Sequence, residues 1–164
     1  MNFEIRDAQP DDVADLVALT RELAQFESLT HLFVATEADL ADALFGLNPA
    51  AGALVATLDN EVVGYALYFQ NYSTFVGKRG LYLEDLYVKP ACRGTGLGTR
   101  LLRAVAALAV ERKCGRFEWT VLDWNRQAID FYERMGATVL SDWRVVRVTG
   151  EALDALAQPA PGDE

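Results

Sequence analysis

The sequence predicts one mixed α+β domain, and three observations lead to this fold class. The chain has 164 residues, a length that suits a single compact domain with a core of its own. Segments with the strand period of two alternate with segments that have the helix period. Near the middle, a cluster of glycines joins a strand pattern directly to a long helix pattern. We therefore expect about six strands in one sheet, with helices packed against it.

The chain begins with a strand pattern and two helix patterns. Residues 3–6 alternate apolar and polar side chains, as a short strand does. Asp11 or Asp12 is expected to cap a first helix. The same capping pattern at Thr36 predicts a second helix that runs to about residue 45.

A hairpin and a further strand are expected next. Residues 53–58 and 62–70 form two strand patterns on either side of the turn residues Asp59-Asn60. Residues 71–80 are polar and contain glycine, so we expect a loop there. The strand pattern 81–88 follows, and a proline ends it.

The second half of the chain continues the alternation. A long helix is expected from residue 97 to about 113, and a strand at 117–122. A helix at 125–135 is closed by Gly136, a residue suited to the left-handed position after a helix. Residues 143–148 are expected to form the last strand.

The net charge narrows the choice of partners. The chain has 24 acidic and 15 basic residues, which gives a net charge of −9 at pH 7. A surface of this sign repels phosphate backbones and anionic lipids, so neither nucleic acid nor a membrane is expected as a partner. Small cationic molecules fit the charge, although the same charge also serves solubility alone.

Cysteine, histidine and the apolar segments set further limits. Cys92 and Cys114 are too few for a disulfide framework, so the cytoplasm is the expected location. With His31 as the single histidine, a common zinc site cannot be built, and no metal is expected. The first residues lack an apolar core of signal-peptide length, and no apolar stretch is as long as a membrane span.

The glycine cluster after the strand 81–88 is the main functional signal. Gly94, Gly96 and Gly98 alternate before a helix, where backbone N–H groups approach a ligand without clashes from Cβ atoms. The helix dipole favours an anion such as pyrophosphate at this point, and Arg93 can add a charge-assisted hydrogen bond. A glycine-rich connector that binds nothing is the alternative.

Two familiar glycine motifs fit less well. The phosphate-loop pattern GxxxxGK[ST] is absent from the sequence. The dinucleotide pattern GxGxxG needs a third glycine where Thr99 stands, although Asp123 can imitate its ribose carboxylate. The loop also falls halfway along a short chain, which leaves no room for a doubly wound sheet.

The run from Arg93 to Gly98 satisfies the acetyl-CoA-binding pattern Arg/Gln-x-x-Gly-x-Gly/Ala of the GNAT acetyltransferases. Within that superfamily the chain resembles the spermidine/spermine (diamine) N-acetyltransferases and their thialysine N-acetyltransferase relatives, from about residue 3 to residue 156. The resemblance is densest at 82–85, 93–98, 121–125 and 131–132.

This resemblance implies a fold and an assembly. The expected fold is the GNAT acyl-CoA N-acyltransferase fold, a mixed central sheet of about six to seven strands flanked by about four helices. A single acetyltransferase domain would occupy residues 1–157, followed by a flexible acidic tail at 158–164. The family resemblance also implies a homodimer whose C-terminal region helps to shape the interface.

The resemblance further implies how acetyl-CoA is bound. The backbone of Leu86, Tyr87 and Val88 would hold the pantetheine arm in the manner of an added strand. The pyrophosphate would be cradled by the amides of Arg93, Gly94, Thr95, Gly96, Leu97, Gly98 and Thr99. Further coenzyme contacts would come from Asn125, Arg126, Gln127 and Ala128, and Tyr132 would lie near the coenzyme sulfur.

Acetyl transfer to an amine requires the neutral amine. A lysine-like ammonium has a pKa of about 10.4, so at pH 7 only about one molecule in 2,500 is neutral. Glu84 matches the carboxylate that acts as a base through water in the family, and Tyr132 matches the proton donor for the leaving thiolate. In a regular strand Glu84 and Asp85 would lie on opposite faces, so at most one of them would point into a given cleft.

The substrate side departs from the polyamine pattern. By resemblance the residues on this side are Phe26, Glu27, Phe75, Glu84, Asp85, Glu118, Trp119, Thr120 and Asp142, the last in place of a glutamate. The polyamine enzymes carry Asp-Pro-Trp where this chain reads Ser73-Thr74-Phe75, so one ammonium-binding carboxylate is missing. The loss is expected to move the preference from spermine to a shorter, lysine-like amine.

The expected function is acetyl-CoA-dependent N-acetyltransfer to a primary amine of a small cationic substrate, such as a polyamine, a diamine, thialysine or lysine. Transfer would occur by direct attack in a ternary complex. One alternative is an acetyltransferase for peptide, protein or drug amines, and another is a CoA-binding sensor without activity. Because Glu84 and Tyr132 are both retained, the sensor is the weaker alternative.

Overall fold

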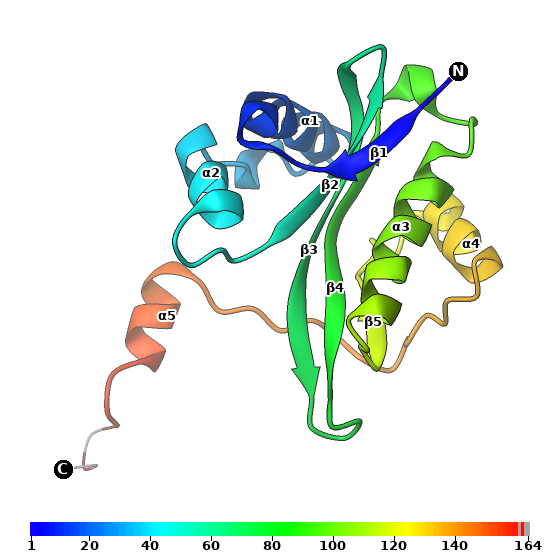
Figure 1. The fold of residues 1–164 in the computed structure, drawn as a ribbon. Helices are drawn as coiled ribbons and strands as arrows, with labels where there is room; N and C mark the ends of the chain where they lie inside the picture. The colour runs from blue at the N-terminus through cyan, green and yellow to red at the C-terminus, as the bar shows by residue number, and fades with distance from the viewer. Residues whose placement is uncertain (161, 163–164) are drawn as a thin grey trace. The chain divides into compact units, whose positions relative to one another are not determined.

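A five-stranded mixed sheet lies at the centre of the first of two compact units, Met1–Thr120 and Val121–Glu164 (Figure 1). The computed structural model describes residues 1–160 and 162. The strands follow one another across the sheet in chain order, and their bounds are β1 Glu4–Asp7, β2 Gly52–Leu58, β3 Glu61–Ser73, β4 Lys78–Val88 and β5 Arg116–Glu118. Neighbours are antiparallel except β4 and β5, which are parallel.

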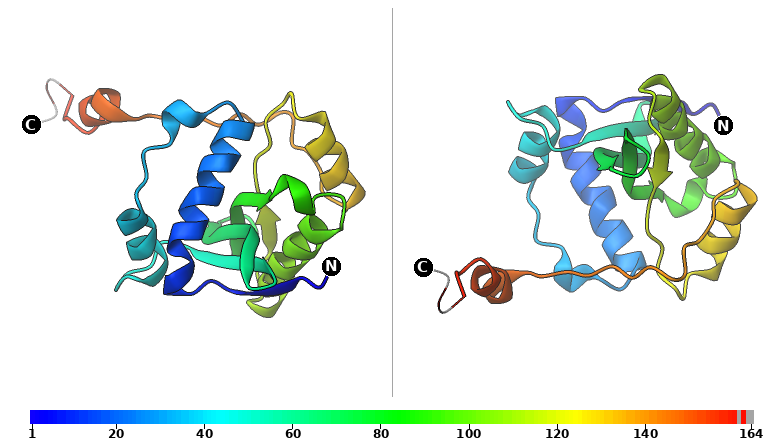
Figure 2. Two further views of the ribbon diagram at one scale, coloured as in Figure 1. Left: turned by 90° about the horizontal axis from the view of Figure 1, so that it is seen from above. Right: turned by 90° about the horizontal axis from the view of Figure 1, so that it is seen from below.

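Helices cover both faces of this sheet. The helices of the first unit are α1 Val13–Phe26, α2 Glu37–Phe45 and α3 Leu97–Glu111. Figure 2 shows α1 and α2 on one face and α3 on the other. Short 3₁₀ turns stand before α1, between α1 and α2, and after β4, at Pro10–Asp12, Thr30–Leu32 and Pro90–Cys92.

The core of the first unit is built from apolar side chains on the two sheet faces. Leu16 and Leu19 of α1 are each 1% exposed and pack with Val55 and Tyr65, which are fully buried. On the other face α3 approaches β3 closely, because a Cβ atom at Gly64 would lie 3.4 Å from a methyl group of Leu101. Burial of this apolar surface is the main stabilising term of the unit.

Several local predictions are confirmed. Thr36 caps α2, since its hydroxyl accepts a hydrogen bond from the Asp39 amide at 3.2 Å and Asp39 bonds back to Thr36. Asp59 and Asn60 form the predicted tight turn between β2 and β3, with φ angles of 51° and 66°. Asn and Asp tolerate this left-handed region better than other side chains.

The capping role predicted for Asp12 is wrong. Asp12 stands before α1 but makes no side-chain hydrogen bond to its first turn. Its carboxylate instead forms a salt bridge with Arg6 at 2.7 Å and accepts the Gln9 amide at 2.7 Å. The pKa of Asp12 is lowered, chiefly by the hydrogen bond from Arg6.

The strand boundaries differ from the prediction in two places. The loop expected at 71–80 is shorter, because β3 and β4 continue to pair up to Ser73 and Lys78. Their polar side chains suit a hairpin with both faces in solvent. The strand expected at 117–122 is reduced to Arg116–Glu118. β4 has a bulge at Glu84, two residues after its last pair with β5. Because a bulge increases the local twist of a strand, its position fits the early end of this pairing.

The second unit contains two helices, α4 Arg126–Arg134 and α5 Gly150–Leu156. The predicted helix and its closing residue are confirmed by α4 and by Gly136, whose φ is +95°. The helix α5 is an addition to the expected elements, and the strand predicted at 143–148 is not formed. No strand is present among the described residues of this unit, so the segment has no partner there to complete a ladder.

The sheet therefore has five strands where six to seven were expected, and the described residues form five α-helices rather than about four. The mixed α+β fold class itself is confirmed. The single domain at 1–157 and the flexible tail at 158–164 stay predictions, and residues 161, 163 and 164 of that tail lie outside the described residues. Over the described part of the chain, no helix is both long and apolar enough to cross a membrane.

Candidate active site

The glycine loop, residues 93–99, connects β4 to the first turn of α3. Gly94 and Gly96 have φ angles of +75° and +83°, which side chains with a Cβ atom rarely adopt. Leu97, only 1% exposed, anchors the start of α3 in the core, while residues 93–96 are exposed. The first N–H groups of a helix have no intrahelical acceptor, so this loop offers backbone donors to an anion from solvent.

Arg93 is the first residue of this loop, and its side chain points toward aromatic side chains. Its Nε donates to the Val88 carbonyl at 2.9 Å. Its guanidinium carbon lies 5.2 Å from the ring centroid of Phe26 and 5.3 Å from that of Tyr87. These cation–π contacts join the glycine loop to the end of α1.

One edge of β4 is free of strand pairing over half its length. On the β3 side, pairing runs from Lys78 to Val88 and leaves Glu84 without an opposite residue. On the other side, β5 pairs only with Gly80, Leu81 and Tyr82. Residues 83–88 therefore have no strand neighbour on that edge within the first unit. Leu86, Tyr87 and Val88, the residues expected to hold the pantetheine arm, lie on this open stretch.

A series of hydrogen-bonded side chains connects β4 to α1, from Asp85 through Tyr65 to Thr20. The Tyr65 hydroxyl donates to Asp85 Oδ2 at 3.1 Å and lies 3.0 Å from the Thr20 hydroxyl oxygen. Thr20 in turn donates to the Leu16 carbonyl at 2.8 Å. Tyr65 is fully buried, so its hydroxyl is satisfied only through this chain.

Two neighbouring carboxylates influence Asp85. The pKa of Asp85 is raised to about 6, chiefly by burial, and the negative charges of Glu84 and Glu27 act in the same direction, whereas the hydrogen bond from Tyr65 lowers it. Burial also raises the pKa of Glu27, which follows the last residue of α1. Glu84 itself is exposed at the bulge. We call Glu27, Glu84 and Asp85 the acidic cluster.

The regular alternation expected for Glu84 and Asp85 does not apply here, because the bulge at Glu84 interrupts it. The two carboxylates nevertheless have different environments, one exposed and one partly buried. Thr20 and Tyr65 are not among the site residues that the sequence predicts. Their only signal is a hydroxyl on the predicted buried face of a helix and another within an apolar strand.

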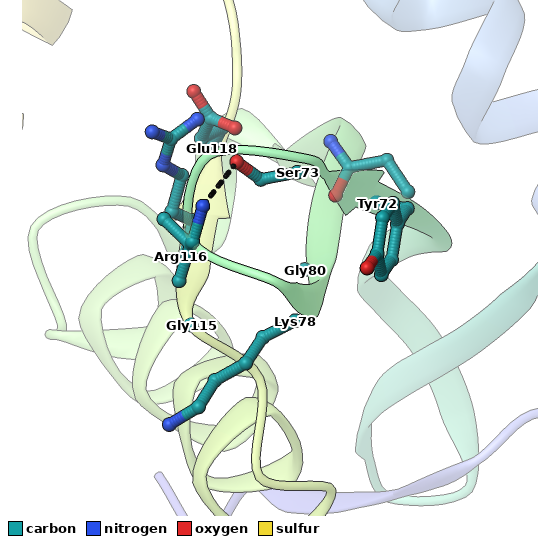
Figure 3. A pocket seen from close by; sticks show the side chains of 9 residues that line it. Tyr72, Ser73, Lys78, Gly80, Gly115, Arg116 and Glu118 are labelled. Atoms are coloured by element: carbon teal, nitrogen blue, oxygen red, sulfur yellow. Dashed lines mark hydrogen bonds between the residues drawn. The ribbon is translucent and has the colours of Figure 1, made fainter.

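Two of the expected substrate-side residues lie near the hairpin of β3 and β4. Phe75 is 97% exposed in the turn at its tip. Glu118 lines a polar pocket that Figure 3 shows from close by, together with Tyr72, Ser73, Lys78 and Arg116. Ser73 Oγ accepts the Val76 amide at 3.2 Å there. The pocket has about 30 Å³ of free space, enough to hold a water molecule.

The remaining expected residues follow β5 or belong to the second unit. The Trp119 ring lies 4.9 Å from the Phe117 ring, and Thr120 ends the first unit. Asn125 caps α4 by accepting the Ala128 amide at 3.2 Å, and the Tyr132 ring lies 5.3 Å from the Phe131 ring. The roles expected for Arg126, Gln127, Tyr132 and Asp142 stay predictions. Among the described residues, no group of three or more His, Cys, Asp or Glu side chains is arranged to hold a metal ion.

Comparison with known proteins gives a consistent result. Residues 16–137 match the model of the acetyltransferase (GNAT) family. The chain is 41% identical to thialysine N-epsilon-acetyltransferase of Mus musculus, over 93% of this chain and 96% of the relative. It is 38% identical to L-ornithine N5-acetyltransferase NATA1 of Arabidopsis thaliana, over 95% of this chain and 88% of the relative.

Solved structures agree with the fold. An integron cassette protein of V. cholerae superposes with a TM-score of 0.80 at 28% identity, covering 97% of this chain and 99% of that chain. An aminoglycoside acetyltransferase from a soil metagenome superposes with a TM-score of 0.76 at 19% identity, covering 91% of this chain and 97% of that chain. The second likeness shows the fold alone.

Proposed function

This chain belongs to the acetyltransferase (GNAT) family and is an N-acetyltransferase, and we propose that it moves the acetyl group of acetyl-CoA to a primary amine of a small cationic substrate. The preferred substrate is a short, lysine-like amine such as thialysine or ornithine. Diamines and polyamines are the neighbouring candidates.

The observation that carries this proposal is the acidic cluster. Asp85 and Glu27 are partly buried in β4 and at the end of α1, and both have raised pKa values because burial disfavours their charge. An ammonium placed between them would compensate that cost, because opposite charges attract more strongly away from bulk water. Two similar relatives are named for thialysine and for ornithine, which both carry an amine at the end of a short chain.

The residues of the glycine loop and of the open β4 edge fit acetyl-CoA. The left-handed glycines leave the amides before α3 accessible to a pyrophosphate, and the unpaired stretch of β4 suits the amides of a pantetheine arm. The Val88 carbonyl already accepts one bond from Arg93, and a carbonyl oxygen can accept two. Bound acetyl-CoA would supply an acetyl thioester, the activated acyl group.

Two residues of this chain would accept and donate the protons of the reaction. Glu84, exposed at the bulge, would draw a proton from the ammonium through a water molecule. Tyr132 would donate its phenolic proton to the leaving thiolate, whose basicity is close to that of a cysteine thiolate. Between these two proton transfers the neutral amine nitrogen would attack the thioester directly and expel the thiolate, within a complex that holds both substrates.

A thiol-release assay with acetyl-CoA tests this function. The amines are thialysine, ornithine, lysine, putrescine, spermidine, spermine and a lysine-containing peptide, each at several concentrations. We expect the highest kcat/KM with thialysine or ornithine and a lower value with spermine, because Ser73-Thr74-Phe75 lacks a carboxylate and Phe75 is exposed. The highest kcat/KM with the peptide would instead favour a protein acetyltransferase. Tight acetyl-CoA binding without turnover of any amine would favour the CoA-binding sensor.

We further propose a homodimer that acts in the cytoplasm. The support for a dimer is the exposure of large apolar side chains in the segment before α5, with Trp143 79%, Val145 72% and Val146 89% exposed. Exposed apolar patches of this kind are common at protein interfaces. Light scattering on the purified protein, with Val146→Asp as the test variant, measures the assembly directly, and a monomer at every concentration would contradict it.

A further inference from the structure

The hydroxyl groups of Tyr65 and Thr20, which are linked to Asp85 by hydrogen bonds, give this carboxyl group a role in the reaction. We propose that Asp85 is the final acceptor of the proton that leaves the amine, and that Tyr65 and Thr20 are positioning residues that accommodate this proton by reversing their hydrogen bonds. The inference rests on the proposed function, since it concerns the amine substrate, and it names the end point of the proton that Glu84 draws through water.

A count of hydrogens along the chain supports this assignment. Three short contacts link Asp85 to Tyr65, Tyr65 to Thr20, and Thr20 to the Leu16 carbonyl, at 3.1, 3.0 and 2.8 Å. Each contact requires one hydrogen. When Asp85 is ionised, Tyr65 and Thr20 supply only two hydrogens for the three contacts. A proton on Asp85 supplies the third, and all three contacts are then hydrogen bonds.

Both protonation states have a defined arrangement. With Asp85 ionised, Thr20 donates to Tyr65 and Tyr65 donates to the carboxylate, while the Leu16 carbonyl keeps its helical hydrogen bond. With Asp85 protonated, the direction reverses, and the bonds run from Asp85 through Tyr65 and Thr20 to Leu16. Only hydroxyl hydrogens move, so no heavy atom must shift when the proton arrives.

The surroundings of Asp85 favour a proton acceptor that works near neutral pH. Tyr65 from β3 and Thr20 from α1 are joined to it by hydrogen bonds, and the charges that influence it are Glu84 in β4 and Glu27 after α1. All these charges are negative. Together with burial, the largest cause, they bring the pKa of Asp85 to about 6. A carboxyl group with such a pKa accepts and returns a proton more readily than one with an ordinary value.

The protons and bonds of the step balance. The ammonium gives one proton through water to Glu84, from which it passes to Asp85, and the neutral nitrogen forms a bond to the acetyl carbon as the carbon–sulfur bond breaks. The thiolate takes a proton from Tyr132, and the nitrogen loses its second proton, which restores Tyr132 through solvent. Asp85 then returns its proton to solvent. The net products are the amide, free CoA thiol and one released proton.

Two measurements on the full-length enzyme test the inference. The first follows the carboxyl carbon of Asp85 by NMR against pH in protein labelled at aspartate, with Asp85→Asn to assign the signal. We expect a midpoint near 6 in the parent protein. Tyr65→Phe removes a donor that stabilises the carboxylate, so the midpoint should rise by about half a pH unit. Thr20→Val should raise it by less.

The second measurement is the pH dependence of kcat/KM with the best amine. We expect an acidic limb with the same midpoint as the NMR titration, an upward shift of that limb in Tyr65→Phe, and its disappearance in Asp85→Asn with a loss of about 10²-fold in kcat. Tyr68→Phe is the matched control. Tyr68 is another buried tyrosine of β3, 5% exposed, whose ring lies 5.5 Å from the Arg112 guanidinium carbon, and its variant should leave the limb unchanged.

The outcomes separate the two proposals. An ordinary aspartate midpoint for Asp85, or a limb that stays in place in an active Tyr65→Phe enzyme, would overturn the role of Asp85 while leaving the N-acetyltransferase function intact. Absence of turnover with every amine would overturn the proposed function, and the acceptor role with it.

Discussion

The glycine loop and the acidic cluster both adjoin β4 and the end of α1, yet they are built in different ways. The glycine loop is made by backbone: two left-handed glycines and the first amides of α3 come from a few consecutive residues. The acidic cluster is made by side chains of β4 and of the residue after α1, with Tyr65 of β3 and Thr20 of α1 bonded behind Asp85, so it depends on the packing of those elements. We therefore expect coenzyme binding to tolerate changes of side chain, whereas amine binding and proton transfer depend on individual side chains.

The largest expected effect comes from a residue that would act only after both regions are occupied. Tyr132→Phe should lower kcat by about 10²-fold or more, because the leaving thiolate loses its proton donor. The dissociation constant of acetyl-CoA should remain nearly the same, since only one hydroxyl is removed. Stopped-flow kinetics and calorimetry measure the two quantities, and an unchanged kcat would exclude Tyr132 as the donor.

A substitution in the glycine loop should have the opposite signature. Gly96→Val forces a side chain into a backbone conformation with φ of +83° and covers the amides before α3. A cost of about 2 kcal/mol predicts a rise of about 30-fold in the dissociation constant of acetyl-CoA, which calorimetry measures.

The control for Gly96→Val is Gly77→Val. Gly77 has a φ of +69° and, like Gly96, has no other atom within 4 Å of the place that a Cβ atom would take, but it lies in the hairpin turn between β3 and β4. Both variants should lose similar stability, and only Gly96→Val should weaken acetyl-CoA binding. Equal binding in the two variants would break the assignment of the loop to the coenzyme.

The acidic cluster should also be visible in stability. The folded-state pKa of Asp85, about 6, lies above the ordinary value of 3.8, so folding favours the protonated form. Stability is therefore lost as the pH rises from about 4 to about 6, and the full cost is present above that range. Asp85→Asn removes the charge, and we expect its free energy of unfolding at pH 7.5 to exceed that of the parent by about 3 kcal/mol.

Urea unfolding at pH 7.5 and at pH 4 measures this difference, which should vanish at the lower pH. Asp12→Asn gives the opposite sign, because the pKa of Asp12 is lowered by its pair with Arg6 and the ionised form stabilises the fold. A loss of stability in Asp85→Asn at pH 7.5 would show that the ionised carboxylate of Asp85 does not destabilise the folded state.

The smallest expected effect concerns the outer carboxylate of the cluster. Glu27→Gln should raise KM for the amine by about tenfold and leave acetyl-CoA binding unchanged, because it removes one attractive charge at a partly exposed position. Glu37→Gln, an exposed change in the first turn of α2, is the control. If both variants gave the same KM, overall charge rather than the acidic cluster would attract the substrate.

The contrast between the two regions also explains how much the sequence could predict. The glycine loop is predictable because its signals are local: alternating glycines, the strand before them and the helix after them. The capping box at Thr36 and the turn at Asp59-Asn60 are local as well. The family resemblance names Glu27, Glu84 and Asp85 one by one, but it does not indicate the bulge that separates the environments of the last two.

The chain from Thr20 to Asp85 could not be predicted, because its members are far apart in sequence. Thr20 and Tyr65 are 45 residues apart and meet through the packing of α1 on the sheet, whereas Tyr65 and Asp85 are 20 apart and meet through the pairing of β3 with β4. The strand expected at 143–148 failed for a related reason. Its alternating pattern is real, but a strand also needs a neighbour with which to pair.

The three-residue pairing between β4 and β5 has a consequence for the order of folding. The strands β2, β3 and β4 are joined by short connections, so their contacts are local and form early. β5 can join the sheet only after α3, which lies between β4 and β5 in the chain, has crossed over the sheet. The three residue pairs between β4 and β5 compensate little of the entropy lost when this long connection is closed. We expect hydrogen-exchange pulse labelling to show β5 protected last, so the short strand that ends beside the open stretch of β4 would join the sheet at the end of folding and be the first to leave it.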